Sequence, residues 1–247
     1  MRNLPPITKK LLLINVICWL ASIVFERYGL DLNRYLGLHY ITASHFHFWQ
    51  PLTYMFMHAG FSHLFFNMFA VMMFGPALEE RWGARRFVIY YLITGLGAAV
   101  IQEVVWALQL QSILNTLDPL VAANLANRVV TIGASGAVFG ILLAFGWLFP
   151  EVRMFLMFIP IPIRARTLVI IYALVELFAG LVPTAGDNVA HFAHLGGMIF
   201  GCILILWWQY GDLIKGKWHD LFHPRHPRIK REKDSVDYND YHYHKPL

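Results

Sequence analysis

The sequence has 247 residues, of which 57% are hydrophobic and only 14% are charged. Soluble globular proteins carry about 25% charged residues, so this composition excludes an ordinary soluble domain and favours a membrane protein. The net charge of +5 does not require a nucleic-acid partner, because eight of the 20 basic residues lie after Gly211, where positive charge beside a membrane explains them. The two cysteines, Cys18 and Cys202, lie in apolar stretches and indicate no disulfide framework.

Six stretches are apolar enough to cross a bilayer as helices, which takes about 20 residues each. These stretches cover roughly residues 9–27, 61–78, 86–110, 132–150, 166–184 and 189–210. We therefore predict an all-α integral membrane protein, with a bundle of six transmembrane helices in residues 1–210. The first stretch has no small-residue cleavage pattern behind it, so we interpret it as a retained span rather than a signal peptide.

The distribution of Lys and Arg predicts the orientation of this bundle. If the N-terminus is cytoplasmic, all but three of the 20 basic residues fall in cytoplasmic segments, the exceptions being Arg27, Arg34 and Arg128. Because cytoplasmic segments of membrane proteins are enriched in basic residues, we predict that both termini are cytoplasmic. Residues 211–247 would then form a basic cytoplasmic tail, which we expect to be disordered and attracted to the membrane surface.

Four polar side chains are predicted to lie near one level in the outer half of the membrane. Ser135 lies a few residues into the fourth span, and His194 lies at a similar depth in the sixth. His63 and Asn67 share one face of the second span because they are four residues apart. Polar residues at this depth are costly and usually mark a functional site. A serine with a histidine as base, and donors for an oxyanion, could hydrolyse a peptide bond.

Small residues predict a close contact between the fourth and sixth spans. The fourth span carries Gly133, Gly136 and Gly140, and the sixth carries Gly197 and Gly201 at four-residue spacing. Such faces let two helices approach to backbone distance. On this pattern alone, the Ser135 hydroxyl could be either a nucleophile or a simple interhelical hydrogen-bonding group, and the partner residues on the other spans favour the nucleophile.

Three motifs give the chain a resemblance to the rhomboid intramembrane serine proteases. In the family's order they are His-Leu-Phe-Phe-Asn at 63–67, Gly-Ala-Ser-Gly at 133–136 and Ala-His-Leu-Gly-Gly at 193–197. The run Glu-Glu-Arg-Trp-Gly at 79–83 resembles a further family motif. Two positions depart from the pattern: Gln50 stands where the family usually has an arginine, and Phe139 where some members have a tyrosine against the base.

The resemblance implies an intramembrane serine endopeptidase with a dyad of Ser135 and His194 and no acidic third member. His63 and Asn67 would stabilise the oxyanion, and His194 would depend on packing against Phe139 for its orientation. The implied partners are transmembrane protein substrates, cleaved near the outer membrane face, and the lipid bilayer. We expect no cofactor, no metal site and no nucleic-acid partner. By analogy with compact six-span members, the expected location is a bacterial plasma (inner) membrane.

Two other classes of function remain open at this point. The first is a non-catalytic rhomboid-like protein that binds membrane clients, which the intact serine and histidine disfavour. The second is a transporter or channel, suggested by Glu176 within the fifth span and disfavoured by the lack of inverted repeats. Glu176 could face water, the substrate entrance or a neighbouring polar group. His191 is the rival base, but it lacks the small-residue setting of His194, and we interpret His58 as structural.

Overall fold

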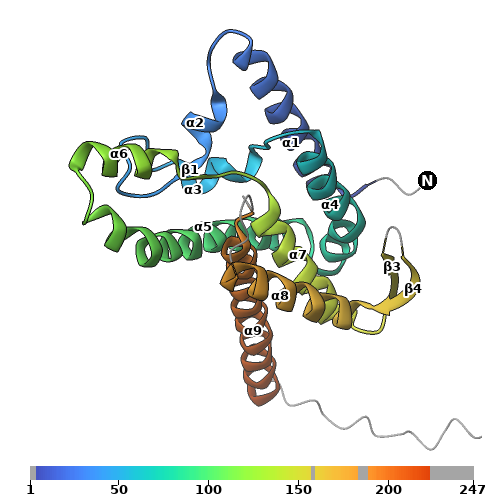
Figure 1. The fold of residues 1–247 in the computed structure, drawn as a ribbon. Helices are drawn as coiled ribbons and strands as arrows, with labels where there is room; N and C mark the ends of the chain where they lie inside the picture. Colours follow the sequence, from blue (N-terminus) through green and yellow to red (C-terminus); the bar gives the residue numbers. More distant parts are fainter. Residues whose placement is uncertain (1–3, 157–158, 183–188, 223–247) are drawn as a thin grey trace, which may run out of the picture. The chain divides into compact units, whose positions relative to one another are not determined.

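The computed structural model describes residues 4–156, 159–182 and 189–222. The described chain is predominantly helical (Figure 1). Its elements, in chain order, are α1 (Pro6–Glu26), α2 (Leu32–Leu36), β1 (Leu38–His39), α3 (Gln50–Thr53), the 3-10 helix η1 (Tyr54–Phe56), α4 (Phe61–Trp82), α5 (Ala84–Leu114), α6 (Pro119–Arg128), β2 (Val130–Thr131), α7 (Ser135–Leu148), β3 (Arg153–Leu156), β4 (Ile159–Arg164), α8 (Ala165–Leu181) and α9 (His191–Phe222).

The chain divides into two compact units, residues 1–207 and 208–247, and the site described below lies in the first. The end of α9 belongs to the second unit and remains helical to Phe222. This differs from the predicted disorder over residues 211–222. The rest of the predicted tail, residues 223–247, lies outside the described residues, so its disorder stays a prediction.

Four of the described helices are long and apolar enough to cross a membrane: α1, α4, α5 and residues His191–Gly211 of α9. Helices also occupy the two remaining predicted spans, but α7 has 14 residues and α8 has 17. Both are shorter than the approximately 20 residues that a helix needs to cross the hydrocarbon core alone. The prediction of a helical membrane protein is confirmed, and helix length supports four of its six spans.

Helix α7 packs against α4, α5 and α8 in the first unit (Figure 1). Its buried residues include Ile141, Ala144 and Phe145. In contrast, α1 exposes large apolar side chains such as Leu13, Ile17 and Val24. A soluble protein would not leave such a face in water, whereas lipid can cover it. The short α7 therefore sits among other helices, and the long α1 presents the apolar surface.

A buried carboxylate joins the start of α1 to the end of α4. Glu79 accepts hydrogen bonds from the backbone N–H groups of Ile7 and Thr8 at 2.8 and 2.7 Å, and from the Thr8 hydroxyl at 2.8 Å. The first N–H groups of a helix have no intrahelical acceptor, and the helix dipole favours a negative charge there. The Glu-Glu-Arg-Trp-Gly motif thus supplies the N-terminal cap of α1.

Gln50 anchors the long loop between α1 and α4 from within the protein. Its side chain is fully buried; its amide donates to the carbonyls of Tyr35 and His45 at 3.3 and 2.8 Å, and its oxygen accepts from the N–H of His39 at 3.2 Å. The residue that departs from the family pattern therefore makes three loop contacts of its own.

The same loop fixes where α7 begins. β1 pairs antiparallel with β2, placing Leu38 opposite Thr131, and Gly133 donates its N–H to the carbonyl of Tyr54 at 2.9 Å. Gly133 has a φ of 130°, a conformation that side chains disfavour. The strand pairing and this hydrogen bond hold the segment that leads into α7, and Ser135 is the first residue of that helix. The prediction that Ser135 lies a few residues inside the helix is wrong.

Candidate active site

Ser135 and His194 meet at the starts of α7 and α9. The Nε2 atom of His194 lies 2.8 Å from the Oγ atom of Ser135. The approach of the two helices depends on Gly197, because a Cβ atom there would overlap the carbonyl oxygen of Gly136. The predicted backbone-distance contact between these helices is present at this pair of glycines.

The other predicted packing glycines face a different helix. A Cβ atom on Gly140 would lie 2.7 Å from Cβ of Thr94, and one on Gly201 would overlap the Tyr90 hydroxyl. Thr94 and Tyr90 both belong to α5, and the Tyr90 hydroxyl donates to the carbonyl of Gly140 at 2.9 Å. Gly140 and Gly201 therefore make their tightest contacts with α5, while the Leu143 side chain of α7 lies 3.4 Å from a Cβ atom on Gly201. Their role in packing at the dyad stays a prediction.

Two side chains flank the imidazole of His194. The ring of Phe139 stacks on it with centroids 4.3 Å apart and planes 9° from parallel, as the sequence predicts. The carboxylate of Glu176, on α8, lies with Oε2 2.8 Å from Nδ1 of His194. The expectation that His194 has no acidic partner is wrong. Of the settings left open for Glu176, pairing with neighbouring polar groups is the one observed.

His191 contacts the same carboxylate oxygen, with Nδ1 2.7 Å from Oε2 of Glu176. Glu176, His191 and His194 thus offer three ligand-type atoms within 4.8 Å of one another, a set that could hold a metal ion. The two hydrogen bonds already account for the positions of these atoms without a metal. His194 makes the 2.8 Å contact with Ser135, so the geometry favours it over His191 as the base.

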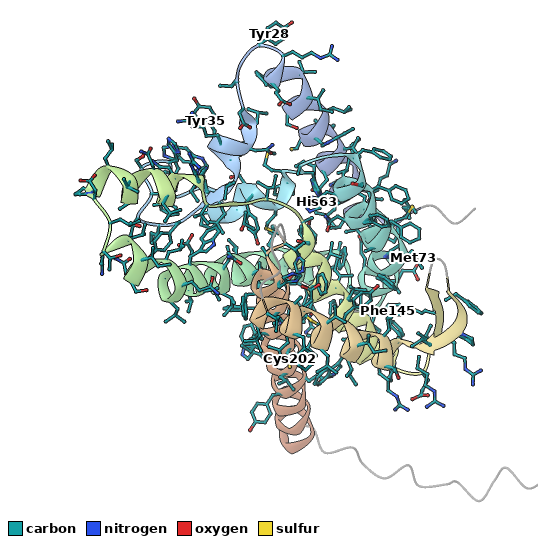
Figure 2. The ribbon with its side chains drawn as sticks, in the orientation of Figure 1. Tyr28, Tyr35, His63, Met73, Phe145 and Cys202 are labelled. Atoms are coloured by element: carbon teal, nitrogen blue, oxygen red, sulfur yellow. The ribbon has the colours of Figure 1, made fainter. Side chains whose placement is uncertain are left out.

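His63 and Asn67 line one cavity together with Ser135 and His194. This cavity has a volume of about 910 Å³, lies among α4, α7 and α8, and has mostly apolar walls. Figure 2 labels His63 and Met73, which mark two levels of α4 along this cavity. The amide of Asn67 donates to the carbonyl of His63 at 2.9 Å. Of the two predicted oxyanion donors, Asn67 is thus bonded within its own helix here.

Gly133 makes room for the His63 ring beside the serine. A Cβ atom on Gly133 would lie only 2.7 Å from Nε2 of His63, so a side chain there would push the ring away. Next to it, the first helical hydrogen bond of α7 runs from Val138 N–H to the carbonyl of Ala134. The N–H groups of Ser135 and Gly136 lie before that bond, at the positive end of the helix dipole, where negative charge is stabilised.

His58 lies behind His63, in the loop that precedes α4. The two rings meet edge to face, with centroids 5.0 Å apart. Burial, with a smaller contribution from His63, lowers the pKa of the His58 imidazole to about 4. Within the described residues, neither buried nitrogen of His58 has a hydrogen-bond partner. Its environment therefore favours the neutral ring, and its interpretation as a structural residue stays a prediction.

Comparison with known families decides what kind of protein carries this arrangement. Residues 45–209, which include all four predicted site residues, match the Rhomboid domain. The chain belongs to the rhomboid family. The resemblance found in the three motifs is thereby confirmed, as is the membrane character that the apolar helices indicate.

Relatives of this rhomboid occur in plants and bacteria. RHOMBOID-like protein 6, mitochondrial, from Arabidopsis thaliana is 31% identical over 156 residues, covering 63% of this chain and 42% of that protein. RHOMBOID-like protein 5 from the same plant is 30% identical over 170 residues, covering 66% and 46%. The Bacillus subtilis (strain 168) protein YdcA, named as a candidate rhomboid protease, is 29% identical over 156 residues, covering 63% and 65%. The chain thus spans less than half the length of the two plant relatives.

Sequence reasoning missed the contact between Glu176 and His194. The available signal was positional, since Glu176 is an ionisable residue within a predicted span and such residues usually have a polar partner. Tyr172 lies one helical turn before Glu176 on α8 and its ring meets that of Phe139 edge to face, with centroids 6.1 Å apart. One face of α8 therefore covers both the stacked ring and the imidazole of this rhomboid.

Proposed function

We propose that this rhomboid is an intramembrane serine endopeptidase that cleaves single-span membrane proteins near the outer membrane face. The observation that carries the proposal is the 2.8 Å contact between Ser135 Oγ and His194 Nε2. A hydroxyl within hydrogen-bond reach of an imidazole is the arrangement that activates a serine nucleophile. The cavity beside it supplies space for an extended peptide segment.

In the proposed reaction, the Ser135 hydroxyl proton passes to Nε2 of His194 as Oγ bonds to the scissile carbonyl carbon. His63, Asn67 and the N–H groups at the start of α7 stabilise the negative charge that develops on the carbonyl oxygen. The C–N bond then breaks, and the leaving amine takes the proton from His194. Water hydrolyses the remaining ester: His194 accepts a proton from the attacking water and returns it to Oγ of Ser135 as the acyl group leaves.

The proposed substrate is a transmembrane helix that unwinds near its outer end, because the backbone of an intact helix is shielded from attack. The extended segment would enter between α4 and α8, both of which contribute residues to the cavity wall. Phe66 and Met73 of α4 and Leu168 and Tyr172 of α8 provide apolar walls. These walls suit apolar side chains, and the polar groups at the serine suit the peptide bond itself.

We further propose that all six predicted spans cross the membrane, with residues 1–210 as the protease domain and both termini cytoplasmic. The short helices α7 and α8 would be accommodated because protein and a polar cavity surround their ends. For the location we propose a bacterial plasma membrane, by analogy with compact six-span members. Relatives named as mitochondrial make an organelle membrane the alternative.

Ser135→Ala provides the direct test of this function. The purified wild-type protein, reconstituted with a generic single-span substrate, should cleave it and should react with a fluorophosphonate probe. The Ser135→Ala variant should do neither, while its melting temperature stays within about 2 °C, because removing one hydroxyl changes little packing. Cleavage that persists in Ser135→Ala would contradict the proposal. Substrate binding by the wild type without cleavage or labelling would favour the non-catalytic client-binding alternative.

A further inference from the structure

We infer that Glu176 is a positioning residue for His194, so that the site works through three side chains rather than two. This inference rests on the proposed function, because it gives His194 the role of base. It concerns a contact between α8 and α9 that joins the Glu176 carboxylate to the far side of the same imidazole that contacts Ser135.

The three groups form one chain of hydrogen bonds. Oε2 of Glu176 lies 2.8 Å from Nδ1 of His194, and Nε2 of that ring lies 2.8 Å from Oγ of Ser135. Glu176 and His194 are both buried, with 8% of each residue exposed. An ionised carboxylate can only accept hydrogen bonds, so Nδ1 must carry the hydrogen. The lone pair of the neutral ring then lies on Nε2, where it can accept the serine proton.

The stacked ring of Phe139 cannot select between the two tautomers of His194. Stacking at 4.3 Å fixes the plane of the imidazole, but it does not distinguish a ring with its proton on Nδ1 from one with its proton on Nε2. A ring protonated on Nε2 would donate to Ser135 and could not act as its base. The carboxylate therefore selects the tautomer that the reaction needs, as the acid of a serine–histidine–acid triad does.

His191 completes the setting of the carboxylate. It donates from Nδ1 to the same oxygen at 2.7 Å, so the buried charge receives two N–H groups. A buried carboxylate without such donors would be strongly disfavoured. His191, the first residue of α9, also holds Oε2 of Glu176 in place through this hydrogen bond. His191 thus supports the carboxylate, and His194 transmits its effect to the serine.

The proton balance of the step leaves Glu176 ionised throughout. The serine proton moves to Nε2 while the Nδ1 hydrogen stays on the ring, which becomes an imidazolium. The adjacent carboxylate stabilises that cation, and no proton passes to Glu176. When the amine leaves, it takes the proton from Nε2 and the ring returns to its starting tautomer.

The test compares Glu176→Gln and Glu176→Asp with the wild type and with Glu103→Gln as a matched control. Glu103 is a half-buried carboxylate on α5 that accepts from the Ile41 N–H at 3.0 Å and does not line the cavity that contains Ser135. Glu176→Gln should lower kcat and the rate of fluorophosphonate labelling by roughly 100-fold, since general base catalysis is worth about 10²–10⁴-fold. KM should stay within about twofold, and Glu176→Asp should recover part of the lost rate. Glu103→Gln should leave both rates within about twofold.

A spectroscopic readout tests the tautomer without any variant of Glu176. In 15N-histidine-labelled wild-type protein, long-range 1H–15N correlations should show His194 protonated on Nδ1, with the signal assigned by its loss in His194→Asn. A proton on Nε2 would overturn the inference, even if Glu176→Gln does not fold. Loss of wild-type activity on treatment with EDTA would also overturn it, in favour of a metal held by Glu176, His191 and His194.

These outcomes separate the inference from the proposed function. Equal labelling rates in the wild type and a folded Glu176→Gln would overturn the positioning role alone, because Ser135 would still be shown to react. An unlabelled wild type would instead overturn the proposed endopeptidase, and with it the role that Glu176 serves.

Discussion

At the scale of single residues, the histidines of this rhomboid differ chiefly in what surrounds each ring. His194 has a stacked ring, a carboxylate and a hydroxyl around it. His58 is buried beside the imidazole of His63, and neither of its nitrogens has a hydrogen-bond partner among the described residues. The same side chain is therefore suited to accept a proton in one place and to remain neutral in the other.

The lowered pKa of His58 predicts how the stability of the folded protein depends on pH. Its pKa in the folded protein, about 4, lies below the ordinary value of about 6.5 in the unfolded chain. Its contribution is thus fully present above pH 6.5 and is lost as pH falls toward 4, at up to about 1.4 kcal/mol per pH unit. Thermal unfolding in detergent between pH 8 and 4 should show this loss as a falling melting temperature.

The phenyl ring of His58→Phe fits a buried site without hydrogen bonds, and it cannot titrate. This variant should lose part of the pH dependence below pH 6.5. The control is His47→Phe, in the same loop, where the histidine stacks on Trp49 with ring centroids 4.5 Å apart. It should keep the wild-type slope. Identical slopes for all three proteins would show that His58 does not carry the effect.

At the scale of elements, close contact between α7 and α9 brings the nucleophile to the base. Glycine at position 197 allows it, because the carbonyl oxygen of Gly136 occupies the place of a side chain. The atom that would obstruct a side chain at position 197 belongs to a helix backbone, and not to a flexible side chain that could rotate away. A helix backbone can yield only if the whole helix shifts, and such a shift would move Ser135, which begins that helix.

Gly197→Ala should therefore impair both stability and reactivity. We expect a loss of about 1–3 kcal/mol from overpacking and a fluorophosphonate labelling rate reduced by at least roughly tenfold, because Ser135 and His194 are forced apart. Gly211→Ala is the matched control on the same helix, since nothing lies within 4 Å of a Cβ atom there. It should be neutral or slightly stabilising, because alanine favours helix over glycine by up to about 1 kcal/mol.

Local patterns predicted the helices better than they predicted the helix ends and contacts. Long apolar stretches give α1, α4, α5 and α9, because hydrocarbon thickness sets their length. The start of α7 depends instead on pairing with β1 and on a bond to Tyr54, distant segments that no local pattern reveals. Glu176 and His194 likewise meet only when α8 lies against α9. Motif spacing predicted Ser135 with His194, whereas the acidic partner required the structure.

At the scale of the whole molecule, the number of membrane crossings depends on α7, which has only 14 residues. Its neighbours bury much of its surface, so it needs less apolar length than a lipid-exposed helix. Thr116 lies just after the end of α5, in the part of the chain that precedes α7. Val152 lies in the segment that follows α7. Both residues are exposed. If α7 crosses the membrane, these two positions face opposite compartments.

Single cysteines at these two positions, Thr116→Cys and Val152→Cys, placed in a background with Cys18→Ser and Cys202→Ser, test that crossing. The prevalence of basic residues on cytoplasmic segments predicts that an impermeant maleimide labels Thr116→Cys only from outside the cell. Val152→Cys should be labelled only in inverted vesicles. Each variant serves as the control for the other, and detergent should make both reactive. Labelling of both from one side of intact membranes would mean that α7 does not cross. Ser135 would then lie in a re-entrant segment, which enters and leaves the membrane by the same face.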